Sequence, residues 1–165
     1  MYTMAGYNRG MRRLHGFLAC LLAMNCTHAA ETAEPTTVRF ATFNVSLHGT
    51  RTGEVAGRLA DPTWQKARLA AATLQEIRPD VLLLNELDWD ERGEGLRRFV
   101  ANFLAEGQGA RAPLDYRYFY LPRVNTGEPS GHDLDRDGTV TTTPGSRAYG
   151  GDAFGYGEYP GQYGM

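Results

Sequence analysis

The sequence predicts an α/β domain in which helices alternate with strands. Val81–Leu84 is a continuous apolar run that is too short for a buried helix, as is typical of a strand covered on both faces. Between residues 38 and 121 the patterns follow the order strand, helix, strand, helix, strand, which indicates a layered α/β fold. A chain of 165 residues, 42% hydrophobic and 22% charged, is long enough for one domain with a core.

The first part of this pattern begins with a strand over Val38–Val45, predicted from its β-branched and aromatic residues. Residues 46–60 hold three glycines and no clear periodicity, so we expect a loop there. Asp61 and Pro62 are typical of a helix start and predict a helix that runs to about Ile77.

The second part follows the strand at Val81–Leu84. Amphipathic spacing predicts a helix from Gly95 to about Glu106, and aromatic residues predict a third strand over Tyr116–Leu121. Residues 123–165 hold ten of the 20 glycines and show neither the apolar spacing of a helix nor the alternation of a strand. We therefore expect a long Gly-rich loop region there. The domain would span residues 38–165, and we interpret it as an incomplete piece of a longer protein.

The amino-terminal residues have the features of a secretory signal peptide. Three arginines precede the apolar run Gly16–Met24, and small residues follow it, so residues 1–29 are expected to be removed near Ala29 or Ala30. The run is shorter than the ~20 residues that span a bilayer, which argues against integral membrane association. We expect a secreted or periplasmic protein with a flexible lead-in over residues 30–37; attachment of a lipid to Cys26 is the alternative.

The charge balance argues against nucleic acid as a partner held by charge alone. The leader contains three of the 17 basic residues and no acidic ones, which leaves 14 basic against 19 acidic residues. Both cysteines, Cys20 and Cys26, also lie in the leader, so the exported part contains neither a disulfide nor a cysteine zinc site.

Polar side chains follow both of the first two predicted strands. Asn44 lies at the end of the first, and Glu86 at the end of the second. A carboxylate at a strand end can be held rigidly enough to bind a metal ion or move a proton. The alternatives are that Asn44 only forms a turn, and that Glu86 begins a solvated acidic loop with Asp88, Asp90 and Glu91.

The segment Asp133-Leu-Asp-Arg-Asp-Gly-Thr139 matches the first half of a calcium loop, because Asp133, Asp135 and Asp137 place oxygen ligands at alternate positions before a glycine. Pro144 stands where an EF-hand has its glutamate, so this is not an EF-hand. Asp152 is the candidate for a further ligand to Ca²⁺. A hydrated acidic turn is the alternative.

Two motifs resemble a known family. Thr42-Phe-Asn-Val45 and Pro79-Asp-Val-Leu-Leu-Leu-Asn-Glu86 resemble the amino-terminal half of the endonuclease/exonuclease/phosphatase superfamily, the fold of DNase I and the neutral sphingomyelinases. The segments Asn125–Gly127, Ser130–Gly138, Asp152–Gly155 and Pro160–Met165 further resemble a secreted bacterial branch. The resemblance implies the amino-terminal part of a four-layered α/β/β/α sandwich of the DNase I-like type.

The resemblance also implies a metal-dependent phosphoesterase that acts on a phosphate ester, and we expect a monomer. Glu86 matches the glutamate that coordinates a catalytic Mg²⁺ or Mn²⁺ ion, and Asn44 matches the asparagine beside it in the metal and phosphate pocket. Leu74-Gln-Glu76 spells the commoner form of the glutamate motif but lies in the predicted helix, so strand position selects Glu86.

The sequence departs from the family pattern in one respect that bears on activity. The family also needs an Asp-x-Asn site and a late Ser-Asp-His, and this sequence contains neither tripeptide. We therefore expect residues 30–165 alone to be inactive. The contrasting hypothesis is a secreted binding or surface module, stabilised by calcium, that has no catalytic activity.

Overall fold

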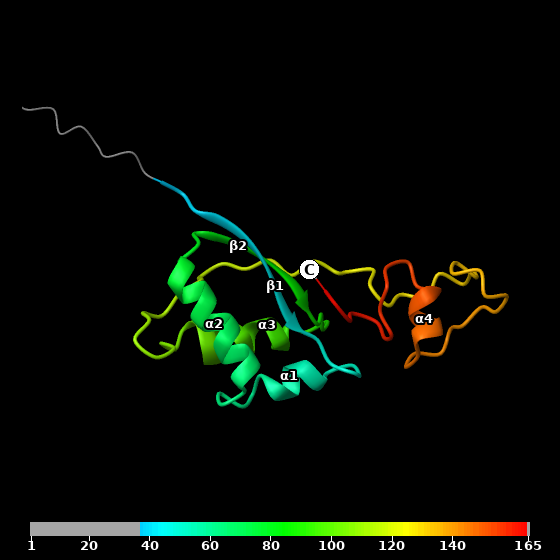
Figure 1. Ribbon diagram of the computed structural model, residues 1–165, viewed down its shortest axis with the longest axis horizontal. Coiled ribbons are helices and arrows are strands. Elements are labelled where there is room, and N and C mark those ends of the chain that lie inside the picture. Colours follow the sequence, from blue (N-terminus) through cyan, green and yellow to red (C-terminus); the bar gives the residue numbers. More distant parts are fainter. Residues whose placement is uncertain (1–36, 165) are drawn as a thin grey trace, which may run out of the picture. The chain divides into compact units, whose positions relative to one another are not determined.

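The computed structural model describes residues 37–164. The elements are β1 (Phe40–Leu47), α1 (Glu54–Arg58), α2 (Gln65–Ile77), β2 (Val81–Leu87), α3 (Glu94–Phe99), the π-helical turn η1 (Val100–Leu104) and α4 (Arg147–Gly151) (Figure 1). The predicted signal peptide, Cys26 and nearly all of the predicted lead-in lie outside the described residues.

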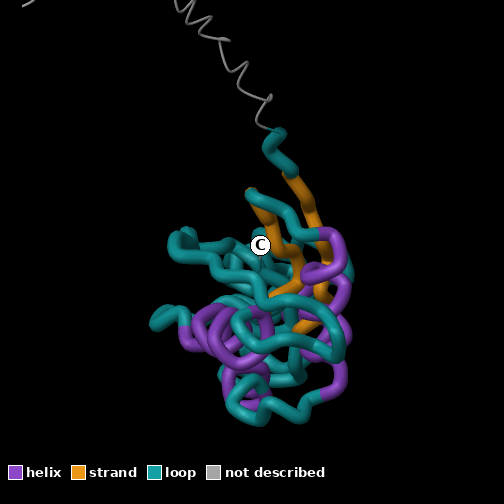
Figure 2. Tube along the Cα trace, turned by 90° about the vertical axis from the view of Figure 1, so that its left-hand side faces the viewer, coloured by secondary structure: helices purple, strands orange, loops and turns teal. Residues whose placement is uncertain are grey.

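The sheet consists of two parallel strands, which run side by side in Figure 2. Phe40 lies opposite Val81 and Asn44 lies opposite Asn85, and α1 and α2 form the crossover between the strands. The chain is therefore a mixed α/β protein with a small parallel sheet. The predicted third strand at Tyr116–Leu121 is wrong, because this segment pairs with neither strand and leaves Tyr118 91% exposed.

The core lies on one face of β2 only. Leu82 and Leu84 pack against the buried core, whereas Val81 and Leu83 are 48% and 51% exposed. The expectation of a strand covered on both faces is therefore wrong for the described residues. The buried apolar residues come mainly from the strand ends and from the helices: Val45, Leu47, Val55, Leu59, Ala67, Ala70, Ala71, Leu74, Leu87, Leu96, Phe99, Phe103, Leu104 and Leu114.

Local side-chain bonds explain where the crossover differs from the prediction. The Asp61 carboxylate accepts bonds from the Thr63 N–H and hydroxyl at 2.8 and 2.6 Å, so it fixes a turn, and α2 begins only at Gln65. The expected loop over residues 46–60 contains α1, where Glu54 pairs with Arg58 one turn later at 2.7 Å.

A buried glutamine joins α2 to the end of the next helical segment. Gln75 is 2% exposed, and its Nε2 donates to the carbonyls of Leu104 at 3.0 Å and Glu106 at 2.8 Å. Its Oε1 accepts from the Gln108 N–H at 2.9 Å. The carbonyls that η1 leaves without intrahelical partners are thereby bonded inside the protein. The predicted helix over residues 95–106 is confirmed in its extent, although it is formed by α3 and η1 together.

The Gly-rich segment is built from closely packed turns and contains the short helix α4. Gly127 has a φ of +67°, and a Cβ there would lie 1.9 Å from the Tyr159 carbonyl oxygen. A Cβ at Gly161, where φ is +87°, would lie 2.5 Å from the Trp89 carbonyl oxygen. Glycine is required at both positions because two backbone segments meet there.

No helix within residues 37–164 has the length and apolar character needed to cross a bilayer.

Replacing Gln75 tests the bonds that join α2 to η1. We expect Gln75→Leu to lower the free energy of unfolding by about 1–3 kcal/mol, because it leaves the buried Gln108 N–H without an acceptor and removes one of the two donors to the Leu104 carbonyl, which keeps the Leu114 N–H. Urea unfolding followed by circular dichroism measures the change. Gln65→Leu, at an exposed position of the same helix, is the matched control. Equal stability of the two variants would contradict the role given to Gln75.

Candidate functional site

The candidate site lies where β1 and β2 end. Asn44 pairs with Asn85 and Leu47 with Leu87, so two residues of β1, Val45 and Ser46, stand opposite Glu86 alone. This is a β-bulge, which bends a strand and redirects its side chains.

Two residues of the bulge adopt left-handed backbone conformations. Ser46 has a φ of 52° and Glu86 a φ of 56°. Each costs about 1–2 kcal/mol for a residue with a Cβ. Both strands therefore leave regular geometry at the position where the sequence placed its candidate ligand.

Asn44 fixes the backbone at the end of β1. Its Oδ1 accepts a bond from the Ser46 N–H at 3.0 Å, so the turn-forming role considered for this residue is real. That bond orients the amide of an exposed residue, whose Nδ2 group can donate two hydrogens. The two roles are compatible.

Glu86 lies beside a histidine. Oε2 of Glu86 is 4.0 Å from Nε2 of His48, and the two side chains are 36% and 30% exposed. Nε2 of His48 is 3.4 Å from the Ser46 hydroxyl, which accepts a bond from Lys66 Nζ at 3.3 Å. We call Asn44, Ser46, His48, Lys66 and Glu86 the strand-end cluster. No sequence motif pointed to Ser46, His48 or Lys66 as site residues.

Asp88 is the residue that fastens the carboxyl-terminal segment to the strand ends. Its carboxylate accepts bonds from the Gly49 N–H at 2.9 Å, the Tyr159 hydroxyl at 2.5 Å and the Tyr163 N–H at 3.2 Å. Gln162 adds a bond from Nε2 to the Gly49 carbonyl at 3.0 Å. The segment 159–163 is therefore bonded to the turns that follow both strands.

The environment of Asp88 affects two pKa values. Burial raises the pKa of Asp88, and the Tyr159 hydroxyl and the two backbone N–H groups oppose that rise. Burial, together with the bond to Asp88, raises the pKa of Tyr159 far above its ordinary value. The tyrosine therefore stays a hydrogen-bond donor over the whole physiological range.

The interpretation of a solvated acidic loop after Glu86 is wrong for two of its residues. Asp88 is 9% exposed and bonded as described. Asp90 accepts bonds from the N–H groups of Glu94 and Gly95, both at 2.8 Å, and so satisfies the first amides of α3.

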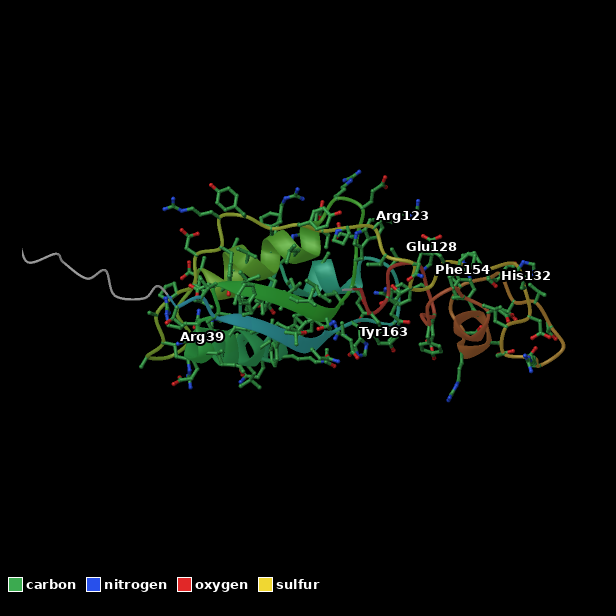
Figure 3. The ribbon with its side chains drawn as sticks, turned by 90° about the horizontal axis from the view of Figure 1, so that it is seen from above. Arg39, Arg123, Glu128, His132, Phe154 and Tyr163 are labelled. Atoms are coloured by element: carbon green, nitrogen blue, oxygen red, sulfur yellow. The ribbon has the colours of Figure 1, made fainter. Side chains whose placement is uncertain are left out.

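An aromatic series extends from the strand-end cluster. The ring of His48 lies 4.6 Å from the ring of Tyr163, and Tyr163 stacks on Tyr156 at 6.1 Å. In Figure 3, Tyr163 is labelled at the ends of the two strands, away from Arg39 at the start of β1. Tyr156 is 49% exposed, so the series connects Glu86, through His48 and Tyr163, to an exposed tyrosine.

The acidic loop brings three of its four predicted calcium ligands together. Oxygen atoms of Asp133, Asp135 and Asp137 lie within 4.8 Å of one another. Asp152 is placed differently: it is 2% exposed, and its two oxygens accept bonds from the N–H groups of Leu134 at 2.8 Å and Thr141 at 2.7 Å.

These bonds give Asp152 a structural role. Backbone N–H donors, that of Thr141 foremost, lower its pKa. Its carboxylate holds both ends of the acidic loop, whereas the clustered ligand atoms belong to the other three aspartates. Those carboxylates also accept bonds inside the loop, including one from the Gly138 N–H to Asp133 at 3.0 Å.

The part of the chain that the structure describes also contains a large cavity, away from the strand-end cluster. It has a volume of about 940 Å³ and lies between β2 and the segment 115–122. Its walls are mostly apolar and include neither Asn44 nor Glu86. It is therefore separate from the strand-end cluster.

Comparison of the chain with protein-family models, with curated proteins and with solved structures found no match.

Removing one hydroxyl tests the attachment of the carboxyl-terminal segment. We expect Tyr159→Phe to lower the free energy of unfolding by about 1.5–3 kcal/mol, since a buried carboxylate loses a donor. Thermal and urea unfolding measure the loss. Tyr118→Phe is the control, because that side chain is 91% exposed. A loss no larger than that of Tyr118→Phe would show that the Asp88 bonds do not hold the segment.

Proposed function

We propose that this chain supplies the metal-binding part of a metal-dependent phosphoester hydrolase. The observation that carries the proposal is that Asn44 and Glu86 lie toward the carboxyl ends of two adjacent, parallel strands, and so toward the same edge of the sheet. In open α/β sheets this edge is where ligands bind.

The residues of the strand-end cluster fit a hard divalent ion. Mg²⁺ is bound in proteins by one or two carboxylates with water and substrate phosphate, and Glu86 offers one partly exposed carboxylate. A divalent ion at Glu86 would polarise a phosphoryl oxygen and neutralise its developing charge. Asn44 would hold the phosphate or a metal-bound water through its amide, because its Oδ1 is already bonded to Ser46.

We further propose that residues 38–165 belong to a larger sandwich of the DNase I-like type in an exported protein. The family resemblance supports this finer description. The exposed face of β2, where Val81 and Leu83 are about half exposed, is consistent with a sheet that has further packing partners.

The chain alone should lack catalytic activity, because it contains neither the Asp-x-Asn nor the Ser-Asp-His tripeptide. We expect no metal-dependent hydrolysis of bis(p-nitrophenyl) phosphate or p-nitrophenyl phosphate above that of buffer with the same metal. Turnover that Glu86→Gln abolishes would support the hydrolase and overturn the expectation of inactivity.

Metal binding at Glu86 can be measured without turnover. We expect Mn²⁺ to broaden the ring signals of His48 in NMR spectra, because its Nε2 lies 4.0 Å from the Glu86 carboxylate. Glu86→Gln should raise the Mn²⁺ concentration needed for this broadening by about tenfold or more, since the site loses its carboxylate. His132, beside the acidic loop, reports separately on any Mn²⁺ bound there.

Glu91→Gln is the matched control for the metal experiment, because Glu91 is an exposed acid after the same strand. Broadening of His48 that is unchanged in Glu86→Gln would contradict the proposed metal site.

A second candidate function is a binding or surface module that is stabilised by calcium. The convergence of Asp133, Asp135 and Asp137 favours it, because three carboxylates this close repel one another and a cation among them would remove that repulsion. Such a module would need no catalytic group.

Calcium should raise the melting temperature of the chain if this loop binds it, and Asp135→Ala should remove that rise. Differential scanning calorimetry with Ca²⁺ and with a chelator measures the difference. Asp115→Ala is the control, since Asp115 is an exposed acid whose side chain is 79% exposed. A wild-type melting temperature that does not respond to Ca²⁺ would exclude the calcium loop.

A further inference from the structure

Lys66 is the only lysine in the chain, and it lies at the strand-end cluster. It is the second residue of α2 and is exposed, and its Nζ donates to the Ser46 hydroxyl at 3.3 Å. Within residues 37–164 no carboxylate oxygen lies within 4.0 Å of this ammonium group. Lys66 therefore brings an uncompensated positive charge to the end of β1.

The positive charge is connected to Glu86 by a continuous series of polar contacts. Lys66 bonds to Ser46 at 3.3 Å, and the Ser46 hydroxyl lies 3.4 Å from Nε2 of His48. The same nitrogen lies 4.0 Å from the Glu86 carboxylate. The bulge creates this arrangement, because the left-handed conformation at Ser46 sets the direction of its side chain.

The donors of this cluster suit a tetrahedral oxyanion. The Lys66 ammonium offers three hydrogens, the Ser46 hydroxyl one and the Asn44 amide two. A divalent ion at Glu86 and the ammonium of Lys66 would repel each other across the cluster. An anion between them removes that repulsion and gains charge-assisted hydrogen bonds.

We propose that Lys66 and Ser46 bind the phosphate group of the substrate, opposite the metal at Glu86. This inference rests on the proposed function, which it extends from a metal site to a site for a phosphate oxyanion. Lys66 supplies the fixed charge. Without phosphate, the Ser46 hydroxyl accepts a bond from Lys66 and so positions the ammonium group. When phosphate binds, Lys66 donates to a phosphate oxygen, and the Ser46 hydroxyl donates its hydrogen to the phosphate as well.

Mutual coupling follows from this arrangement. Phosphate and metal should each tighten the binding of the other by the same factor, as linkage requires. An anion that binds Lys66 without touching the metal site would show much weaker coupling.

Because the chain has one lysine, its side chain can be followed through a ¹³C-dimethyl label, which keeps the positive charge and one N–H donor. Reductive methylation with ¹³C-formaldehyde labels Lys66 and the amino terminus, and Lys66→Arg identifies the lysine signal. In the presence of Mg²⁺ we expect inorganic phosphate to shift the Lys66 signal until saturation, and chloride at equal ionic strength to leave it in place. Dimethyl phosphate distinguishes the sources of the oxyanion. It should shift the Lys66 signal if the site accepts phosphodiesters, and leave the signal in place if the site accepts only monoesters.

Variants then test which side chains carry the affinity. Calorimetric titration of the full chain with inorganic phosphate should show about tenfold weaker binding for Lys66→Met, and binding close to wild type for Lys66→Arg. Ser46→Ala should weaken binding by a smaller factor. Arg117→Met removes one charge from a side chain that is 80% exposed and should have no effect.

The outcomes separate this inference from the proposed function. Equal phosphate affinity of Lys66→Met and Arg117→Met would overturn the role of Lys66. If Mn²⁺ broadens His48 but phosphate does not shift the Lys66 signal, the metal site stands and the phosphate site is wrong. If phosphate shifts the Lys66 signal while Mn²⁺ does not broaden His48, the oxyanion site stands and the metal site is wrong.

Discussion

The arrangement of the strand ends depends on one buried carboxylate. Asp88 follows β2, yet it accepts hydrogen bonds from the turn after β1, through the Gly49 N–H, and from Tyr159 and Tyr163 near the other end of the chain. A carboxylate with so little access to water is stable only when its oxygens have donors, and here three groups supply them. One side chain thus determines how three distant segments meet.

The same junction explains how a small sheet holds residues in uncommon backbone conformations. Ser46 and Glu86 both have positive φ, and the bonds from the Ser46 N–H to Asn44 and from the Asp88 N–H to the Leu47 carbonyl enclose the strained residues. Such backbone strain persists only where several surrounding contacts hold the residue in the strained conformation. The β-bulge therefore brings the polar side chains of Ser46, His48 and Glu86 together at the strand ends.

The sequence predicted the parts of the fold that follow from local patterns. The first two strands, the long helix and the helix after Glu86 were predictable because apolar spacing and breakers act over a few residues. The burial of Asp88, its bond to Tyr159 and the approach of Lys66 to Ser46 were not, because they join residues 20 to 71 positions apart. The glycines of residues 123–165 indicated loops and turns. They did not show that Gly127 and Gly161 lie where two backbone segments come into close contact.

The bond between Asp88 and Tyr159 also orders events during folding. It joins residues 71 positions apart, whereas the bond from the Arg39 N–H to Asp80 at the start of the sheet joins residues 41 apart. The extra entropy of closing the longer loop is below about 0.6 kcal/mol, so length alone is a small obstacle. The order in which the chain emerges matters more: when it emerges from its amino terminus, in synthesis or in export, the two strands come first, and Asp88 stays hydrated until residue 159 follows. The sheet can form while the chain is still emerging, but the turns that carry the strand-end cluster close only after residues 159–163 are available.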